Sequence, residues 1–357
     1  MRAPETIRRL LVIRHRAGGD VLLTTPALRA LRAGLPGAAI DVATSRGFRG
    51  ILEGNPDVSR ILDFDPRSIR SQAALYATLL RGGYDAVLDL VSNPRSAWMA
   101  AFTRAPLRMG YDLRGRGWAY TERLPREPLA PDGRPIPRYA PEAALDFVRA
   151  LGLPTRGLAL TFRVSPAAEA SVDRWLAQSG IDRSRPLIAC LPTGSWPAKS
   201  WPPERFAAVM DRLAPLAEVI WCWGPGEREA VDACRARMSA RSTLAPEAGW
   251  QELGALLKRC AVWIGNDSGP KHVAVALGVP TVTVFGPTNP VNWHPPEGPH
   301  TFVEADGLDC LHCNTNRCPL PGDRHMRCMR DVPVERVVEA ARALLGARTR
   351  EAPCASA

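Results

Sequence analysis

The first half of the chain alternates short runs of leucine and β-branched residues with longer segments of helical periodicity. This alternation is typical of a parallel sheet whose strands are joined by crossover helices. Strands are expected at residues 8–13, 40–43, 58–63 and 86–90, and helices at 25–33, 67–81, 95–103 and 141–151. Residues 104–138 are rich in Arg, Pro and Gly without clear periodicity, which predicts long loops.

A second series with the same pattern follows a predicted linker at residues 152–166. Its strands are expected at 187–191, 218–222, 261–264 and 281–285, and its helices at 203–213, 227–238, 251–258 and 270–277. The sequence therefore predicts an α/β protein with two Rossmann-like domains, residues 1–160 and 161–345. The amphipathic last helix, 334–345, could pack back on the N-terminal domain, and residues 346–357 are expected to form a flexible tail.

Length and composition agree with this picture, because 357 residues exceed what one hydrophobic core usually serves. The hydrophobic fraction of 46% and the charged fraction of 23% exclude a disordered or collagen-like chain. The apolar stretch near the N-terminus, residues 10–13, is too short for a signal peptide or a membrane span, so we expect a cytoplasmic protein.

The formal net charge of +10 suggests an anionic partner: a nucleotide, a phosphorylated glycolipid, an acidic membrane surface or nucleic acid. Charge alone does not choose among these. Arginine supplies nearly all of it, since the lysines are Lys199, Lys258 and Lys271. A lysine retained in so arginine-biased a chain suggests that a compact ammonium is needed at that position, although chance is the alternative.

The segment 261–290 predicts a phosphate site. A strand leads into the polar turn Asn266-Asp267-Ser268-Gly269, and Pro270 then opens a helix, where its missing N–H costs nothing. Such a helix start presents free backbone N–H groups at the carboxyl edge of a parallel sheet, which suits a pyrophosphate. The alternative, compatible with phosphate binding, is that Asp267 or Ser268 simply caps the helix.

Two further loops are candidates for the same edge. Residues 193–202 contain Thr193, Gly194 and Ser195, which can approach a phosphate, and Lys199, which can neutralise a departing leaving group. The alternative is a solvated loop lysine. In the loop after the first strand, Asp20 could be a general base or a helix N-cap; the nearby Thr25 offers an equally good helix start.

Taken together, these segments resemble glycosyltransferase family 9, the bacterial heptosyltransferases that build the inner core of lipopolysaccharide from ADP-heptose. The resemblance covers nearly the whole chain. It rests on residues 18–28, 199–202, 265–272 and 285–288. It implies the GT-B architecture, in which two Rossmann-like domains face one another and the C-terminal domain holds the donor. Many relatives have Ser-Leu-Gly-Asp where this chain has Ala17-Gly18-Gly19-Asp20, so contacts of this loop are expected to differ.

The resemblance also implies roles for individual residues. Asp20 would deprotonate the acceptor hydroxyl for an inverting attack, and Lys199 would stabilise the departing diphosphate without a catalytic metal. Glu227 matches loosely a residue that contacts the nucleotide ribose, with a helix-terminus carboxylate as the alternative. The full set of expected donor-binding residues is Thr193, Gly194, Ser195, Glu227, Asp267, Ser268, Gly269, His272 and Thr288. His272 could brace the phosphate loop or simply pack.

Four cysteines crowd near the C-terminal end of the chain: Cys310, Cys313, Cys318 and Cys328. Four thiolates in a glycine- and proline-rich stretch suit a tetrahedral structural metal, zinc by default and iron second. Reduced, unliganded thiols are the alternative. The related autotransporter heptosyltransferases carry iron on cysteines, and any metal here is expected to serve the scaffold rather than the reaction.

The acceptor is expected to be an anionic, lipid-linked molecule at the inner face of the membrane. Arg114 and Arg116 could grip its phosphates or the membrane surface, or belong to a solvated basic loop. Two rival functions remain open: an enzyme of the same fold with a protein or other glycan acceptor, and a non-catalytic protein that binds a nucleotide-sugar or nucleic acid. We expect no nucleic-acid binding, because the tryptophans follow no recognised pattern for it.

Overall fold

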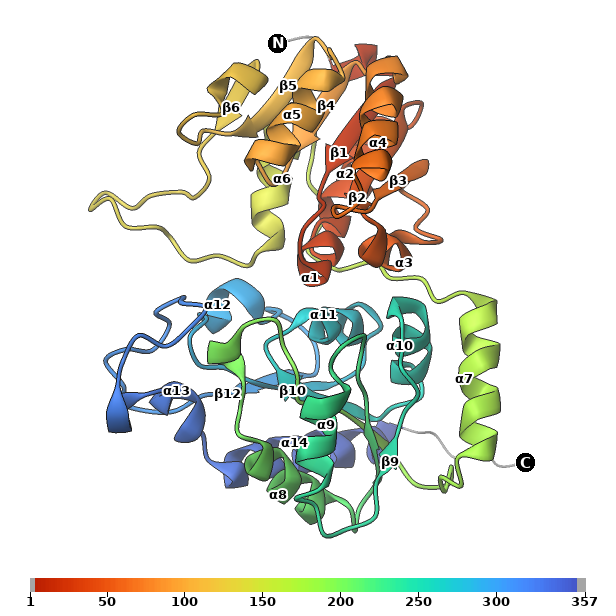
Figure 1. Cartoon of the computed structure of the whole chain (residues 1–357), viewed down its shortest axis with the longest axis vertical. Helices are drawn as coiled ribbons and strands as arrows, with labels where there is room; N and C mark the ends of the chain where they lie inside the picture. Colours follow the sequence, from red (N-terminus) through yellow and green to blue (C-terminus); the bar gives the residue numbers. More distant parts are fainter. Residues whose placement is uncertain (1–3, 352–357) are drawn as a thin grey trace. The chain divides into compact units, whose positions relative to one another are not determined.

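The computed structural model describes residues 4–351 and falls into two compact units, Met1–Arg163 (unit 1) and Val164–Ala357 (unit 2). Each unit is a parallel sheet with helices on both faces (Figure 1). Both units therefore have the layered α/β architecture that the alternation of strands and helices predicts.

Unit 1 contains a six-stranded parallel sheet in the order β3-β2-β1-β4-β5-β6. Its strands are β1 (Arg9–Ile13), β2 (Ala39–Ser45), β3 (Arg60–Phe64), β4 (Ala86–Asp89), β5 (Leu107–Tyr111) and β6 (Glu122–Leu124). The central strands are buried almost throughout, since β1 and β4 present Leu11, Ile13 and Val87 to one apolar core. The order reverses direction between β1 and β4, and this is the point at which doubly wound sheets bind ligands.

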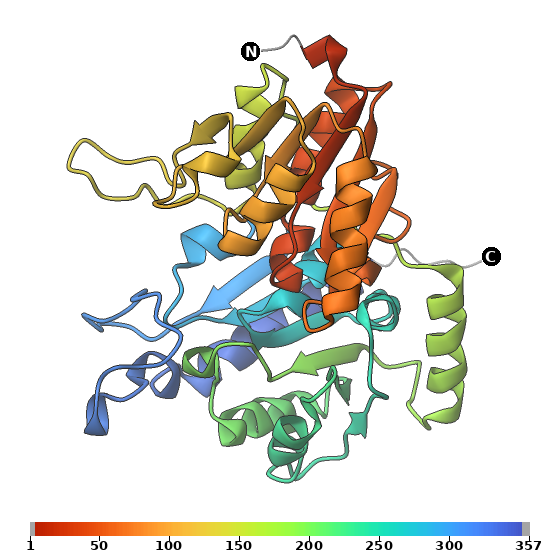
Figure 2. The same ribbon diagram turned by 45° about the horizontal axis from the view of Figure 1, so that its top comes forward.

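The helices of unit 1 cover the two faces of this sheet (Figures 1 and 2). They are α1 (Gly18–Leu22), α2 (Thr25–Gly34), α3 (Arg49–Leu52), α4 (Ile69–Arg81), α5 (Pro94–Phe102) and α6 (Pro141–Ala150), with short 3-10 turns η1 (Pro4–Thr6), η2 (Arg46–Phe48) and η3 (Gly117–Ala119). The helices α2 and α6 pack together, and α4 packs with α5. Pro26, Pro94 and Pro141 lie in the first turns of their helices, as proline's fixed φ favours.

The region expected to form long loops, residues 104–138, instead adds the strands β5 and β6 to the sheet. The expectation was wrong because Arg108 and Gly110 interrupt the apolar run of β5. Gly110 is required there: a Cβ at this position would lie 2.5 Å from the ring of Tyr120. A glycine that close packing requires thus interrupts the apolar pattern from which the strand β5 would be predicted.

Unit 2 repeats the same topology, with the sheet order β12-β11-β10-β7-β8-β9 and every pairing parallel. Its strands are β7 (Leu187–Leu191), β8 (Glu218–Trp221), β9 (Thr243–Leu244), β10 (Val262–Asn266), β11 (Thr281–Val284) and β12 (His300–Val303). The switch point lies between β7 and β10, the counterparts of β1 and β4.

The first helix of unit 2, α7, starts at Pro166, the last residue of the expected linker, and the sequence analysis did not predict this helix. The helices of unit 2 are α7 (Pro166–Gln178), α8 (Pro203–Leu213), α9 (Arg228–Arg235), α10 (Trp250–Leu257), α11 (Gly269–Ala276), α12 (Pro290–Trp293), α13 (Arg327–Arg330) and α14 (Val334–Glu351), with 3-10 turns η4 (Pro197–Lys199) and η5 (Gly322–Arg324). No helix described between residues 4 and 351 is long and apolar enough to cross a membrane.

The last helix, α14, is longer than expected. It continues to Glu351, six residues past the expected end, so the expected tail is helical as far as the structure describes it; residues 352–357 lie outside the described part. Its apolar face is used within unit 2, where Val337, Val338 and Ala341 join the core against α8 and β10–β12. This packing gives the apolar face of the helix its partner within unit 2.

Candidate active site

In unit 2, the loops that follow the neighbouring strands β7 and β10 converge at the carboxyl edge of the sheet. The first loop ends in η4, which carries Lys199, and the second carries Asp267 and Ser268 into the start of α11. Lys199 and Asp267 are 68 positions apart in sequence but form an ion pair, with Nζ 2.8 Å from Oδ2. The sequence motifs are thus joined at the topological switch point, where this fold class binds ligands.

Asp267 is the centre of a buried charge cluster. Its side chain is 4% exposed, and Oδ1 lies 2.5 Å from Nζ of Lys271, whose side chain is fully buried. The hydroxyl of Thr288 donates to Oδ2 at 2.9 Å. Burial raises the pKa of Asp267, but the ammonium groups of Lys271 and Lys199 outweigh it and hold this pKa well below its usual range. The carboxylate is therefore ionised, and one negative charge faces two positive ones.

Aromatic rings enclose the two ammonium groups. Nζ of Lys199 lies 4.7 Å from the ring centre of Trp196 and 5.8 Å from that of Trp293. Nζ of Lys271 donates to the carbonyl of Trp293 at 3.0 Å and lies 4.8 Å from the ring of Phe285. Apolar walls strengthen electrostatic interactions in the cluster, so its net positive charge is suited to an anionic ligand.

The start of α11 is not capped by a side chain, which corrects the expectation that Asp267 or Ser268 caps it. Asp267 is used by the lysines, and Ser268 Oγ is buried without a hydrogen-bond partner among residues 4–351. Gly194 faces this hydroxyl, because a Cβ added to it would lie 3.8 Å from Cβ of Ser268. A helix start with uncapped N–H groups, an unpaired hydroxyl and a net positive charge is a phosphate-binding arrangement.

Other expected donor-binding residues make no side-chain polar contact with the charge cluster of Lys199, Asp267 and Lys271 within residues 4–351. Thr193 is half-buried and Ser195 is exposed in the loop after β7. Glu227 precedes α9, and its Oε2 accepts a hydrogen bond from the N–H of Gly224 at 2.8 Å, so it organises its own loop. Beside this loop, the Trp223 indole donates to the carbonyl of Ala245 and carries the guanidinium of Arg228 on its face.

His272 lies fully buried in α11, and its Nδ1 has no partner in the described part of the chain. Burial lowers the pKa of His272 well below its ordinary value, and the charge of Lys271 adds to this effect. The imidazole is therefore neutral at physiological pH. It is suited to packing beneath the loop or to a neutral hydrogen bond, and it adds no positive charge for a phosphate.

In unit 1, Asp20 lies in α1, directly after β1 at the switch point of that sheet. Asp20 is not the N-cap, because α1 begins at Gly18; α2 starts at Thr25, as the sequence suggested. Its Oδ2 lies 2.6 Å from Nη2 of Arg14, whose guanidinium also donates to the carbonyl of Leu90. Oδ1 has no partner among residues 4–351, so the carboxylate is oriented by Arg14 and one oxygen can accept a proton.

His15 and Asn93 border the same edge of unit 1, and the sequence analysis did not identify either. His15 is buried, its Nε2 lies 3.3 Å from Nδ2 of Asn93, and its carbonyl accepts from Ser45 at 2.6 Å. Burial lowers the pKa of His15 to about 4, with Arg95 and Arg16 acting in the same direction. The one available signal was the Asn93-Pro94 pair that opens a helix, which reports a cap and gives no indication of a site.

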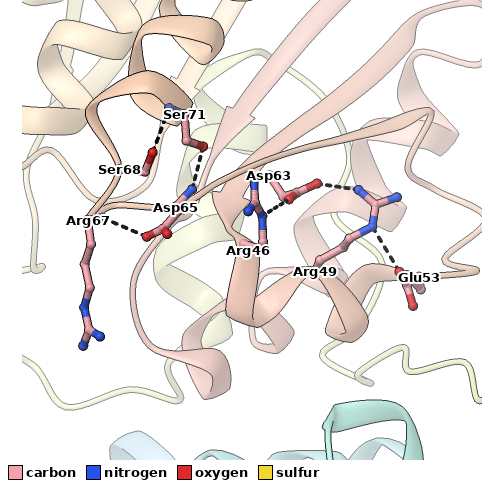
Figure 3. Close-up of polar contacts among 8 residues, drawn as sticks. All are labelled: Arg46, Arg49, Glu53, Asp63, Asp65, Arg67, Ser68 and Ser71. Carbon is pink, nitrogen blue, oxygen red and sulfur yellow. Dashed lines mark hydrogen bonds and ion pairs between the residues drawn. The ribbon is translucent and has the colours of Figure 1, made fainter.

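Unit 1 also contains a cavity of about 440 Å³ between β3, η2 and α4, which the sequence did not predict. Its lining residues are Arg46, Leu62, Asp63, Ser68, Arg70, Ser71, Ala74, Leu75 and Thr78. Figure 3 shows the polar side, where Asp63 is shared by Arg46 and Arg49, and Arg49 also pairs with Glu53. Arg70 has no partner among the described residues, so it is the lining cation available to an anion.

The expected acceptor residues lie apart from this cavity lining. Arg114 is exposed, and Arg116 is half-buried just before η3, where its Nη1 donates to the carbonyl of Arg114 at 2.8 Å. Both arginines precede Trp118 in the connection between β5 and β6 at the edge of the sheet.

The expected metal site is not supported. No group of three or more His, Cys, Asp or Glu side chains within residues 4–351 is arranged to hold a metal ion. The thiols have separate partners: Cys313 Sγ lies 3.2 Å from Thr315 Oγ1, and Cys318 Sγ accepts from the N–H of Met326 at 3.3 Å. Cys328 is buried in α13, which raises the pKa of its thiol to about 11. Cys310 is half-buried; Cys354 lies outside the described residues.

Comparison with known proteins agrees with this geometry. The sequence profile of glycosyltransferase family 9 (heptosyltransferase) matches residues 72–322, more than half of the chain. The chain belongs to this family. It is 26% identical over 290 residues to lipopolysaccharide heptosyltransferase 3 of Escherichia coli, covering 78% of this chain and 83% of that protein.

Solved structures confirm the fold of this family 9 member. A glycosyltransferase family 9 protein from Veillonella parvula has a TM-score of 0.80 at 24% identity, covering 95% of this chain and 97% of that one. The E. coli ADP-heptose lipopolysaccharide heptosyltransferase II gives 0.76 at 22% identity, with 96% and 99% covered. The α/β fold of the GT-B type is thereby confirmed, and the family match confirms the glycosyltransferase class. Asp20 precedes the segment that the family profile matches.

Proposed function

We propose that this chain transfers a heptose from an ADP-sugar to a lipopolysaccharide core acceptor, with inversion at the anomeric carbon. The observation that carries the proposal is the cluster of Lys199, Asp267 and Lys271 beside the unpaired Ser268 hydroxyl at the switch point of unit 2. Two of the relatives above, both from Escherichia coli, are named as lipopolysaccharide heptosyltransferases, and one of these is named for ADP-heptose. We place the reaction at the cytoplasmic face of the membrane, where the net charge of +10 favours anionic lipids.

On the donor side, Lys199 stabilises the negative charge of the departing diphosphate. Its side chain is 15% exposed, whereas Lys271 is fully buried and holds Asp267 in place. The uncapped start of α11 and the Ser268 hydroxyl supply neutral donors to the same anion. These groups provide the positive charge that leaving-group departure requires, so transfer should persist in the presence of EDTA.

The Lys199→Met variant tests this assignment. Loss of a charged group that stabilises the leaving group should lower kcat by about 10²–10³-fold, measured as ADP release. Lys258→Met is the matched control, because Lys258 also lies in unit 2 but pairs with Glu169 at the surface. An unchanged kcat for Lys199→Met, with Lys258→Met also normal, would remove Lys199 from the mechanism.

On the acceptor side, Asp20 is the base that removes the proton of the attacking hydroxyl. Arg14 fixes one carboxylate oxygen and the other has no described partner, as proton transfer requires. Asp20→Asn should lower transfer by about 10²–10⁴-fold, while ADP binding, measured by calorimetry, is kept. Asp132→Asn, an exposed carboxylate of unit 1 paired with Arg134, is the control. Nearly normal turnover in Asp20→Asn would refute the assignment.

The cavity beside α4 is the acceptor-side feature best suited to an anionic group. Arg70 lines it without a partner, and the Ser68 and Ser71 hydroxyls accept backbone N–H groups while keeping their own protons available. Arg70→Gln should raise KM for the acceptor and leave KM for the donor unchanged. Arg67→Gln is the control, because its side chain points away from the cavity residues in Figure 3. Equal effects of both variants would argue against a role for the cavity.

A further inference from the structure

Unit 1 exposes three aromatic side chains that lie together: Trp98 (52% exposed), Phe102 (40%) and Trp118 (53%), here called the aromatic patch. The ring centres of Trp98 and Trp118 are 4.5 Å apart, and those of Trp98 and Phe102 are 6.1 Å apart. Tyr76 of α4 supports the patch from the side, 4.7 Å from Phe102. Single exposed apolar residues are common on protein surfaces, but a contiguous aromatic cluster marks an interaction site.

The core does not account for these rings. Helix α5 already buries Ala97, Met99 and Ala100 against the sheet. Trp98 and Phe102 lie one turn apart on its opposite side, so they share a face that points away from the core. Trp118 reaches the same face from η3, which packs on α5. The aromatic patch is therefore an additional apolar surface that helix packing does not require.

The charge around the patch is strongly positive. Residues 95–126 contain seven arginines and two carboxylates, a net charge of +5. Arg104, at the end of α5, and Arg114, before η3, are exposed and have no side-chain partner among residues 4–351. One of the carboxylates, Asp112, is already paired with Arg123. The aromatic patch is thus flanked by guanidinium groups that are free to meet an anionic surface.

We propose that the aromatic patch docks unit 1 onto an anionic lipid membrane, an inference that rests on the proposed function because a lipid-linked acceptor is embedded in one. Indole rings favour the interface between headgroups and acyl chains, and nearby arginines bind acidic headgroups. A second copy of this chain is a poor occupant, because a symmetric contact would bring arginines against arginines. Single-stranded nucleic acid needs open ring faces, whereas Trp98 and Trp118 lie against each other.

Flotation of the full chain with vesicles, in the absence of substrates, tests the docking separately from catalysis. The chain binds vesicles of phosphatidylglycerol mixed with phosphatidylcholine and not vesicles of phosphatidylcholine alone, and added salt weakens binding. Trp98→Ser with Trp118→Ser lowers the vesicle affinity about tenfold or more, whereas Trp98→Phe with Trp118→Phe retains most of it. Leu216→Ser, which removes an exposed apolar side chain of unit 2, leaves the affinity unchanged.

A second readout uses the acceptor in two forms. The paired serine substitutions slow transfer to acceptor embedded in these vesicles and leave transfer to a water-soluble, deacylated acceptor unchanged. Three outcomes overturn the proposal: vesicle affinity unaffected by the serine substitutions in a folded protein, a dimer that the substitutions dissociate, or oligonucleotide binding that is lost with vesicle binding unchanged. If the protein catalyses no transfer but the serine substitutions abolish flotation, the docking stands and the proposed reaction fails.

Discussion

The buried charge cluster of unit 2 predicts a large stability loss for Asp267→Asn. The carboxylate is 4% exposed and neutralises Lys271, whose side chain is 0% exposed. Removal of one partner from a buried ion pair costs about 3–5 kcal/mol, because the remaining charge is left without compensation. The weakened hydrogen bond from Thr288 adds about 1 kcal/mol. Water can reach Lys199, which is 15% exposed, so it contributes less.

Urea unfolding followed by tryptophan fluorescence measures this loss, since Trp201, Trp221 and Trp263 are buried in the core of unit 2. The double variant Asp267→Asn/Lys271→Met should be more stable than Asp267→Asn by about 2 kcal/mol or more, because it removes the fully buried charge of Lys271 that Asp267→Asn leaves unpaired. The surface pair of Glu169 and Lys258 provides the control, and Glu169→Gln should leave the unfolding midpoint unchanged.

The stability of Asp267→Asn should depend on pH with a defined sign. Burial lowers the pKa of Lys271, and loss of Asp267 lowers it further. The folded variant then releases a proton that the unfolded chain keeps up to its ordinary pKa of 10.5, so stability rises as pH increases toward that value.

A loss below about 1 kcal/mol for Asp267→Asn, or a double variant less stable than the single one, would refute the reasoning.

Three further predictions concern the two units separately. Burial lowers the pKa of His15 from 6.5 to about 4. As pH falls from 6.5 to about 4, the unfolded state therefore takes up a proton before the folded state does, and up to about 3 kcal/mol of stability is lost. In His15→Gln the urea midpoint should depend less on pH. Gly265→Ala places a Cβ 2.4 Å from the carbonyl of Leu191 and should cost about 1–3 kcal/mol in urea unfolding. Gly47→Ala, with open space around it, should be nearly neutral. EDTA should leave the initial rate of ADP release unchanged, and restoration of a lost rate by added metal would contradict this.

Much of the fold could be predicted because the sheets are buried on both faces. Strand β7 is apolar throughout and β1 is apolar after Arg9, and the helices α8 and α2 that follow them have proline in the first turn, so pattern and structure coincide. The pattern failed where a residue satisfies a tertiary neighbour. Gly110 accommodates the Tyr120 ring inside β5, so the strand lacks an uninterrupted apolar pattern.

The candidate site shows the same division. The phosphate turn, the Lys199 loop and Asp20 are local motifs, and the order of strands predicts that such motifs collect at the carboxyl edges of the two sheets. The sequence did not predict the partner of each charge. Asp267 was a candidate donor-binding residue and, with Ser268, one of two candidate helix caps, yet it binds two lysines, one of them from a different loop. The expected metal at the cysteines is unsupported among residues 4–351 for the same reason, since spacing along the chain does not determine where the thiols of Cys313 and Cys318 point.

What the sequence by itself determined is the family, the α/β class and the identity of the residues that could carry charge to a phosphate. Short-range rules are sufficient for these, because periodicity, helix starts and motifs are properties of neighbouring residues. Only the tertiary structure decided which charges are paired, which are buried and which rings remain exposed. These depend on contacts between residues tens of positions apart, such as Lys199 with Asp267 and Trp98 with Trp118, and burial changes the energy of each.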